Sequence, residues 1–481
     1  MAESSNASEV PATGHVENSL KIVWVLAWPA VALNSLQTLN ALLDTFFISN
    51  VSRQAMTAAG AAMPFIFLFF SITFAIGIAA TAIVSRAFGA GVIAECITAN
   101  RKCLSLATYL GFALFLIAWP ASFGAAHALI PKGDVASRVL FIEYASIYML
   151  SLPSVFIIQS LAGSLRGIGD TRSPMVISGI QIFLHIALNF LLILPEREVF
   201  GITVPGADLG LKGAAIGMAV SSLCAAVTYI AWSKRTQLKS RFTMAWPGME
   251  WIRRIVRIAA PASMMAFFRV SSLMAFAFIL RSLPNKDDAA IAVAAIRPGF
   301  SIESFAFMPA FGLSIAAATL VGQSLGMKRP DRAAKLGWVA AHQAGIVSLT
   351  ISVLLFIFAS PLAHFIIGAQ QDVADVTANF IRFVASTEVF FAYGMVMMRA
   401  MQGAGDTRRP MWLSVFALWG VRVPLAAVLA LPSITIFGFI TIHGANMGAN
   451  GAWLSMAVTQ LIQGVVAVIL WKKGAWKSQE V

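Results

Sequence analysis

Charged residues are scarce in this chain. Asp, Glu, Lys and Arg together make up 11% of its 481 residues, whereas about a quarter of the residues in a soluble domain are charged. Hydrophobic residues make up 59%, and the mean hydropathy is +0.81. So many apolar residues cannot all be hidden inside one globule in water. The composition therefore excludes an ordinary soluble protein and indicates that most side chains face lipid.

Cysteine and histidine are also scarce, and nucleotide-binding motifs are absent from the sequence. The three cysteines give no disulfide or metal framework. The six histidines are scattered without HExxH spacing, and no GxxxxGK[ST] occurs. We therefore predict no metal, no cofactor and no enzymatic activity. Any work that the protein does must be driven by an ion gradient or by the gradient of its substrate.

What the chain does contain is a series of long apolar stretches. A membrane-spanning helix needs about 20 mainly apolar residues. Twelve stretches meet this requirement, at roughly 20–48, 55–85, 103–123, 138–165, 175–195, 211–233, 252–283, 290–325, 336–360, 374–402, 411–433 and 449–471. A transmembrane barrel would instead show short alternating strands. We predict an all-α polytopic membrane protein with twelve transmembrane helices.

Basic residues predict the orientation of these spans. Lys and Arg gather in the connections from even to odd spans, and the clearest examples are Arg101, Lys102, Lys234, Arg253, Lys335 and Lys472. The positive-inside rule places these residues and both termini in the cytoplasm. Residues 1–19 and 472–481 are then cytoplasmic tails, and 234–251 is a cytoplasmic linker, of a protein in the inner (cytoplasmic) membrane. The same asymmetry explains most of the +13 net charge, so we expect lipid and no nucleic acid as a partner.

Several motifs occur twice, once in each half of the chain. The repeats pair residues 163–175 (GSLRGIGDTRSPM) with 399–411 (RAMQGAGDTRRPM), 206–220 (GADLGLKGAAIGMAV) with 444–458 (GANMGANGAWLSMAV), and 84–89 (VSRAFG) with 321–326 (VGQSLG). Their nearly constant offset predicts two six-helix bundles, at 20–233 and 252–471, related by an axis along the membrane normal. We interpret the doubled GDTR segment as a cytoplasmic helix–loop–helix connector, with Asp170 and Thr171 capping the helix that follows.

These motifs, together with LLDTFFIS at 42–49, resemble the multidrug and toxic compound extrusion (MATE) family, in its DinF-like bacterial branch. The resemblance extends over about residues 20–471. It implies two six-helix bundles around a central cavity that opens alternately to each side of the membrane. It also implies export of organic compounds in exchange for H⁺ or Na⁺.

Asp44 is the candidate for coupling transport to an ion. It ends a polar stripe on one face of the first span, with Asn34, Gln37 and Ala41 spaced three or four residues apart. An ionisable group inside a span is costly and invites a functional hypothesis, and desolvation favours the neutral form of a carboxyl. We predict that Asp44 binds and releases a proton. The alternative is a helix-packing acid held by a neighbouring amide or hydroxyl.

The resemblance assigns Asp44 to the first-helix acid of the proton-coupled branch, and Asn189 to a fifth-helix amide near that acid. Ile193 stands where related transporters often have a second Asp. The supporting polar cavity is predicted to consist of Asn34, Gln37, Asn40 and Asn189. We expect His185 to be a packing or hydrogen-bonding residue.

Four charged residues in the predicted spans of the second half form a separate candidate site. They are Arg269, Arg297, Glu303 and Glu388. One interpretation is that acids and bases form buried pairs. The other is a charged half of the cavity, in which Arg269 accepts anionic or zwitterionic substrates. Arg399 and Arg422 are expected to reach the cytoplasmic interface by snorkelling.

The resemblance also bears on the coupling ion, because Arg269 and Phe391 stand where Na⁺-coupled relatives have a Glu and an Asp. We therefore predict an antiporter that exports small organic, amphipathic compounds in exchange for protons by alternating access, acting as a monomer. One alternative is Na⁺-coupled export. Another is a flippase for lipid-linked oligosaccharides, whose phosphate the arginines within the spans would bind.

Overall fold

The computed structural model describes residues 16–131, 133–199, 202–239, 245–368, 370–436 and 440–479. Most of the predicted tail at 1–19, the middle of the predicted linker at 234–251 and the end of the predicted tail at 472–481 therefore lie outside the described residues.

The first half of the described chain, called the N bundle below, is built from helices and one hairpin. Its elements are α1 (Val16–Ser49), α2 (Arg53–Gly89), α3 (Ile93–Leu129), α4 (Val135–Met149), α5 (Leu152–Gly167), α6 (Arg172–Leu192), β1 (Pro195–Val199), β2 (Ile202–Ala207) and α7 (Gly210–Ser233). The predicted continuous span at 138–165 is wrong in one respect, because α4 and α5 meet at an angle of 41°. Pro153 lies in the first turn of α5, and a proline cannot donate the backbone bond that would continue α4.

The second half, called the C bundle, follows the same plan with more interruptions. Its elements are α8 (Met249–Arg281), α9 (Lys286–Gly326), α10 (Pro330–Ile357), α11 (Ala359–Ile367), α12 (Gln371–Ala385), α13 (Glu388–Gly403), α14 (Arg408–Val415), the π-helix η1 (Phe416–Arg422), α15 (Val423–Ala430), β3 (Ser433–Ile436), β4 (Ile440–His443) and α16 (Gly448–Lys473). The predicted span at 374–402 is broken by 55° between α12 and α13. The Thr387 hydroxyl at this break bonds back to the Val384 carbonyl, a contact that bends helices.

Ten helices of the described chain are long and apolar enough to cross a membrane, and the two bent pairs bring the number to twelve. This agrees with the predicted polytopic helical fold. The two short hairpins were not predicted. Each closes the loop between the last two spans of its bundle, and Ser433 begins β3 at the position 238 residues after Pro195, where β1 begins.

Backbone conformation confirms the internal repeat at single residues. Gly169 and Gly405, which occupy the same place in the doubled GDTR segment, both have φ of 90°. Asp208 and Asn446, which follow the two hairpins, have φ of 50° and 51°. Such left-handed conformations are uncommon outside glycine, Asn and Asp, so their recurrence at matching positions shows that the two halves share one backbone design.

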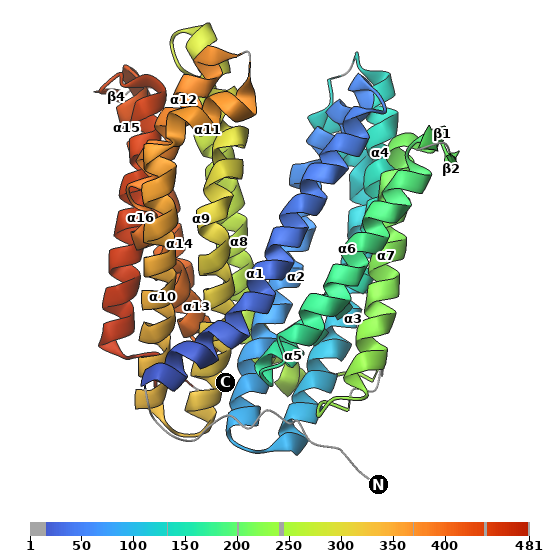
Figure 1. Cartoon of the computed structure of the whole chain (residues 1–481), viewed down its shortest axis with the longest axis vertical. Coiled ribbons are helices and arrows are strands. Elements are labelled where there is room, and N and C mark those ends of the chain that lie inside the picture. Colours follow the sequence, from blue (N-terminus) through green and yellow to red (C-terminus); the bar gives the residue numbers. More distant parts are fainter. Residues whose placement is uncertain are drawn as a thin grey trace.

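The two bundles exchange the first part of their first helix. Val23 and Ala27, near the start of α1, are buried in a cluster formed by α9, α10, α13 and α16 of the C bundle. Further along α1, Phe47 is buried in the N bundle. Figure 1 shows α1 crossing from below the C bundle to the N bundle. Reciprocally, Ile255 and Ile258 near the start of α8 belong to the core of the N bundle.

The bundles also meet where the ends of α2 and α9 pack together, at the end of the molecule where α1 begins and α16 ends (Figure 1). A Cβ atom on Gly89 would overlap the Gln323 carbonyl, and one on Gly326 would overlap the Arg86 carbonyl. Only glycine permits this approach of two backbones. The paired motifs at 84–89 and 321–326 therefore pack on one another.

Side chains of the same motifs tie the two bundles together. The Gln323 Nε2 donates to the Gly167 carbonyl at 2.9 Å. The Arg86 Nη1 donates to the Ala404 carbonyl at 3.3 Å, and Ala404 directly follows Gly403, the counterpart of Gly167 in the second half. We call this arrangement of Arg86, Gly89, Gln323 and Gly326 with the two carbonyls the seam. The doubled GDTR segment is thus a connector, as predicted, and also one side of the contact between bundles.

Candidate functional site

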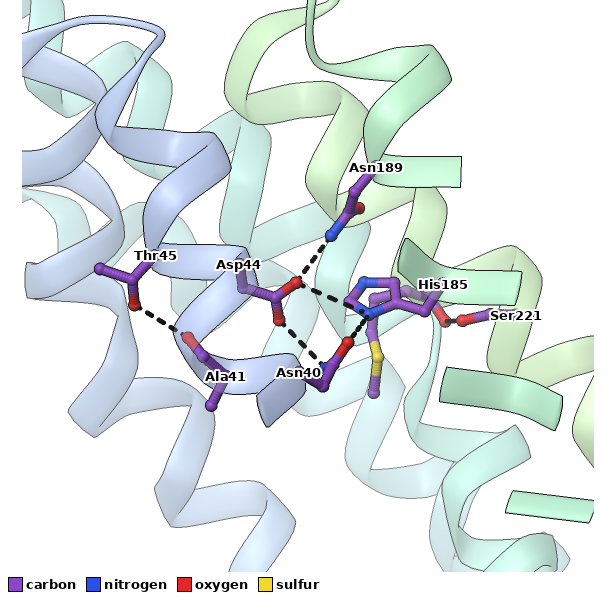
Figure 2. A network of polar contacts seen from close by, with 8 residues as sticks. Asn40, Ala41, Asp44, Thr45, His185, Asn189 and Ser221 are labelled. Carbon is purple, nitrogen blue, oxygen red and sulfur yellow. Dashed lines mark hydrogen bonds and ion pairs between the residues drawn. The ribbon is translucent and has the colours of Figure 1, made fainter. Parts of the chain in front are cut away.

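Asp44 lies on the second half of α1, where this helix faces α6 of the N bundle. Its Oδ1 accepts a hydrogen bond from Asn189 Nδ2 at 2.7 Å, and its Oδ2 accepts one from Asn40 Nδ2 at 3.3 Å (Figure 2). Asn189 is fully buried, whereas the Asp44 side chain is 26% exposed. The carboxyl therefore has a fixed amide partner on one side and partial access on the other.

His185 completes this cluster from the same face of α6, one turn before Asn189. Its Nδ1 lies 3.2 Å from Asn40 Oδ1 and 3.7 Å from Asp44 Oδ1. Figure 2 shows the ring beside the Asp44–Asn40 pair. We expected a packing or hydrogen-bonding role for His185, and its contact with Asn40 agrees with this prediction. Its spacing of four residues from Asn189 is the signal that the two side chains face the same partner.

No Lys or Arg among the described residues is paired with Asp44, and the one imidazole within ion-pair distance of its carboxyl is that of His185. Tyr144 and Tyr148 of α4 lie within electrostatic range and are phenols. An acid held by neutral donors can change its protonation state without breaking an ion pair, so this cluster can bind and release a proton.

The amide of Asn189 can serve both states of that acid. Its Nδ2 now donates to Asp44, while its Oδ1 is buried and has no hydrogen-bond partner among the described residues. An amide carries a donor and an acceptor on one plane. Turned by half a rotation, the same side chain would present an acceptor to a protonated carboxyl.

The other predicted polar residues of α1 lie elsewhere. Asn34 Nδ2 donates to the Ala30 carbonyl of its own helix at 2.6 Å. Asn34 and Gln37 line a cavity between the bundles and form no hydrogen bond with Asp44 among the described contacts. The predicted stripe is thus two sites, because Asn34 and Gln37 line the space between the bundles, whereas Asp44 faces α6 of the N bundle.

This cavity between the bundles, called the interbundle cavity below, has a volume of about 280 Å³. Polar side chains reach it from both halves, and the main ones are Asn34, Gln37, Gln159, Arg166, Arg399 and Gln402. Arg166 was not predicted as a cavity residue, and Arg399 was expected at the interface with water. Both belong to the last turns of helices that lead into the doubled GDTR segment, and that segment lies inside the contact between bundles.

The second half has its own cavity, called the second cavity below, with a volume of about 250 Å³. It is lined by Arg269, Glu303 and Arg422 together with several aromatic rings. Glu303 Oε1 accepts from Gln460 Nε2 at 3.2 Å. Glu388 is 1% exposed and lies within electrostatic range of Glu303. Among the described residues, neither carboxylate oxygen of Glu388 has a hydrogen-bond partner.

The predicted pairing of Arg269, Arg297, Glu303 and Glu388 is wrong. No ion pair joins any two of them in the part of the chain that the structure describes. Arg297 instead donates from Nη2 to Thr45 Oγ1 at 3.1 Å, across the bundles and beside Asp44. Arg422, expected to snorkel, is 7% exposed and lies within electrostatic range of Glu303. The π-helical turn that ends at Arg422 places it in the cavity wall.

Comparison with known proteins gives a consistent result. The model of the MatE family matches the chain twice, over residues 29–191 and 261–428, so each half carries one copy. "Probable multidrug resistance protein NorM" of Thermotoga maritima is 26% identical over 477 residues, covering 95% of this chain and 93% of that protein. "Probable multidrug resistance protein YoeA" of Bacillus subtilis is 23% identical, with 92% of each chain covered.

Solved structures share the fold. A crystal structure of MATE in complex with MaL6 superimposes with a TM-score of 0.83 at 19% identity, covering 96% of this chain and 98% of that one. An outward-facing conformation of a multidrug resistance MATE family transporter gives a TM-score of 0.82 at 19% identity, covering 96% and 97%. With the twelve spans, the repeat and both family matches in place, this chain belongs to the MATE family of membrane transporters.

Proposed function

We propose that this transporter exports organic compounds in exchange for protons and that Asp44 is the proton-binding group. The observation that carries the proposal is the setting of Asp44: a single carboxyl in a span, bonded to Asn189 and Asn40 and to no Lys or Arg among the described residues. Each inward proton gains about 2.3 kcal/mol per 100 mV of membrane potential. The names of the relatives, which describe multidrug resistance proteins, support drug-like compounds as the cargo.

The groups around Asp44 favour H⁺ over Na⁺ as the coupling ion. A hard cation requires several oxygen ligands at once. The described polar contacts of the Asp44 carboxylate are instead with nitrogens: Asn189 Nδ2 at 2.7 Å, Asn40 Nδ2 at 3.3 Å and His185 Nδ1 at 3.7 Å. Two of these are amide donors, which stabilise an anion and compete with a cation. In the second half, Arg269 stands where the resemblance places a Glu of Na⁺-coupled relatives, and it adds positive charge to the cavity there.

Transport follows from an exchange between two arrangements of the bundles. The bundles here are joined at the seam, which closes the end of the molecule where α1 begins. In the other arrangement the seam opens and the interbundle cavity connects to that side. We place the protein in the inner membrane with both termini in the cytoplasm. In this orientation the seam lies on the cytoplasmic side, so the present state is closed to the cytoplasm. We take the working unit to be a monomer with lipid as its surroundings.

The experiment is efflux from proteoliposomes under a proton gradient or a sodium gradient, imposed separately. Asp44→Asn is expected to abolish proton-driven efflux while the protein remains folded in size-exclusion chromatography. The matched control is Asp208→Asn, because Asp208 is exposed after the first hairpin and its counterpart in the second half is already Asn446. Unchanged proton coupling in Asp44→Asn, or efflux driven by sodium alone, would overturn the proposal.

A further inference from the structure

The interbundle cavity has a net positive wall. Arg166 of α5 and Arg399 of α13 line it from opposite bundles. No Asp or Glu occurs among its described lining residues. The cavity also lies outside the Asp44 cluster, since neither Asp44 nor Asn189 lines it. Two positive charges that face one space without an acid give it a positive potential, which attracts anions.

Both arginines keep N–H donors that their described contacts do not occupy. Arg166 Nε donates to the Ala162 carbonyl of its own helix at 3.1 Å. Arg399 Nη1 donates to Gln402 Oε1 at 3.1 Å, and its guanidinium lies 5.7 Å from the centre of the Phe311 ring. A guanidinium has five N–H donors. Among the described residues, no carboxylate pairs with either side chain.

The charged groups around the cavity reinforce this sign. Arg399 lies within electrostatic range of Arg166 and of Arg269. The acids of the adjoining connectors are occupied, because Asp170 accepts from the Ser173 amide and Asp406 is paired with Arg409.

The other acid-bearing sites nearby do not neutralise the cavity. Glu303 is bonded to Gln460 and lies near Arg422 in the second cavity. The carboxyl of Asp44 faces α6 in the N bundle.

The rest of the wall fits the body of an amphipathic molecule. Phe70, Phe74 and Phe311 face the cavity together with the amides of Gln159 and Gln402. Aromatic rings accept the flat face of an organic ligand, and arginine forks bind carboxylate or phosphate with two parallel bonds.

We infer that the interbundle cavity binds organic anions, with Arg166 and Arg399 holding a carboxylate, sulfonate or phosphate and the aromatic wall holding its apolar body. This inference rests on the proposed export function and specifies its substrate class. The shared chemistry also fits the phosphate of a lipid headgroup. Cationic compounds would have to enter a space with two unpaired guanidinium groups and no counter-charge, which makes them the poorer ligands.

The experiment is equilibrium binding to the purified full-length protein, without any gradient, using three matched probes: 2-naphthoate, neutral 2-naphthamide and 2-naphthylmethylammonium. The wild type is expected to bind naphthoate about tenfold more tightly than naphthamide, as a charge-assisted bond predicts, and the ammonium most weakly. The double variant Arg166→Gln/Arg399→Gln is expected to bring the naphthoate-to-naphthamide ratio close to one, while naphthamide affinity is unchanged.

Arg382→Gln is the control, because Arg382 is exposed on α12 and its described side-chain bond is a long one to Asn379. Equal binding of the three probes, preference for the ammonium, no saturable naphthoate binding, or a preference that survives the double variant would overturn the inference. The wild-type comparison stands even if the double variant does not fold. Because no gradient is used, unchanged proton coupling in Asp44→Asn would overturn the proposed coupling and leave this result intact.

A second arm identifies the source of the anion. Phosphatidic acid is added to nanodiscs that hold the wild-type protein with bound naphthoate. Displacement of naphthoate supports the inference and assigns the cavity to a lipid phosphate. Retention of naphthoate supports it and assigns the cavity to soluble organic anions.

Discussion

Gly89 of α2 packs directly against the backbone carbonyl of Gln323 of α9, and the repeat places Gly326 in the same relation to the carbonyl of Arg86. Both contacts cross from one bundle to the other. Their symmetry means that closing this end of the molecule depends on two backbone approaches that allow no side chain.

Gly89→Ala is therefore expected to hold the seam apart. Its methyl group would overlap the Gln323 carbonyl, and this backbone group can move away only if helix α9 moves with it. We expect the distance between spin labels at Thr98 and Lys335, two exposed positions on opposite bundles, to shift to longer values in a cysteine-free background. Gly60→Ala is the control in the same helix, because nothing lies within 4 Å of a Cβ there. Identical distance distributions in the two variants would contradict the role of the seam.

The partner of the proton-binding acid can be disturbed from a third helix. A Cβ on Gly217 of α7 would lie 2.7 Å from Asn189 Oδ1, so Gly217→Ala is expected to push the amide away from Asp44. A hydrogen bond to a charged group contributes about 1.5–3 kcal/mol, which corresponds to a loss of proton-driven efflux of roughly tenfold or more.

The matched comparison is Gly179→Ala, where a Cβ would meet only Leu36 Cδ1 at 3.8 Å. Efflux under a fixed pH gradient is measured for both variants. If Gly217→Ala transports as well as Gly179→Ala, the position of the Asn189 amide does not matter for coupling.

Membrane potential should affect transport of an anion more strongly than it would affect the exchange of a proton for a neutral compound. Exchanging one proton inward for one monovalent anion outward moves two charges in the same electrical sense. At about 2.3 kcal/mol per charge per 100 mV, the electrical part of the driving force is twice that for exchange of one proton with a neutral compound. Naphthoate efflux at constant pH gradient, with the potential set by valinomycin and potassium, is expected to rise steeply as the interior becomes negative. Efflux that ignores the potential would contradict export of an anion in exchange for a proton.

Glu303, which lines the cavity of the second half, and Glu388, which lies within electrostatic range of it, should respond to the same substitution in opposite directions. Glu388 is buried without a hydrogen-bond partner among the described residues and beside Glu303, so Glu388→Gln removes an unfavourable carboxyl. Glu303 has Gln460 as a donor and Arg422 as a neighbouring cation, so Glu303→Gln leaves a buried charge uncompensated. We expect the melting temperature to be kept or raised in the first variant and lowered in the second. Intrinsic tryptophan fluorescence during heating measures both, and a lower melting temperature for Glu388→Gln would show that its carboxyl is needed.

The membrane class, the twelve spans and the repeat could be predicted from sequence because they depend on local composition and on spacing along the chain. The breaks within two spans could not. The bend before α13 depends on the Thr387 hydroxyl and on Gln460, which is 73 residues away. Such bends are determined by tertiary contacts, and the hydropathy of the sequence does not indicate them.

The candidate site divides in the same way. Asp44 was predictable, because an acid in an apolar span is conspicuous whatever surrounds it. The helical stripe wrongly grouped Asn34 and Gln37 with Asp44, because these two residues line the cavity between the bundles whereas Asp44 faces α6. Arg166 and Arg399 lie near the ends of spans, and sequence alone cannot distinguish an arginine in water from one in the contact between two bundles.

The exchange of the first part of α1 and α8 has a consequence for how such a chain could arise and fold. A single half, cut at the connection after α7, would lack Ile255 and Ile258 in its core, and the other half would lack Val23 and Ala27. Two copies of one half could complete each other only by trading these segments, which is domain swapping. The tandem chain keeps both exchanged segments in one polypeptide, so each half supplies part of the hydrophobic core of the other.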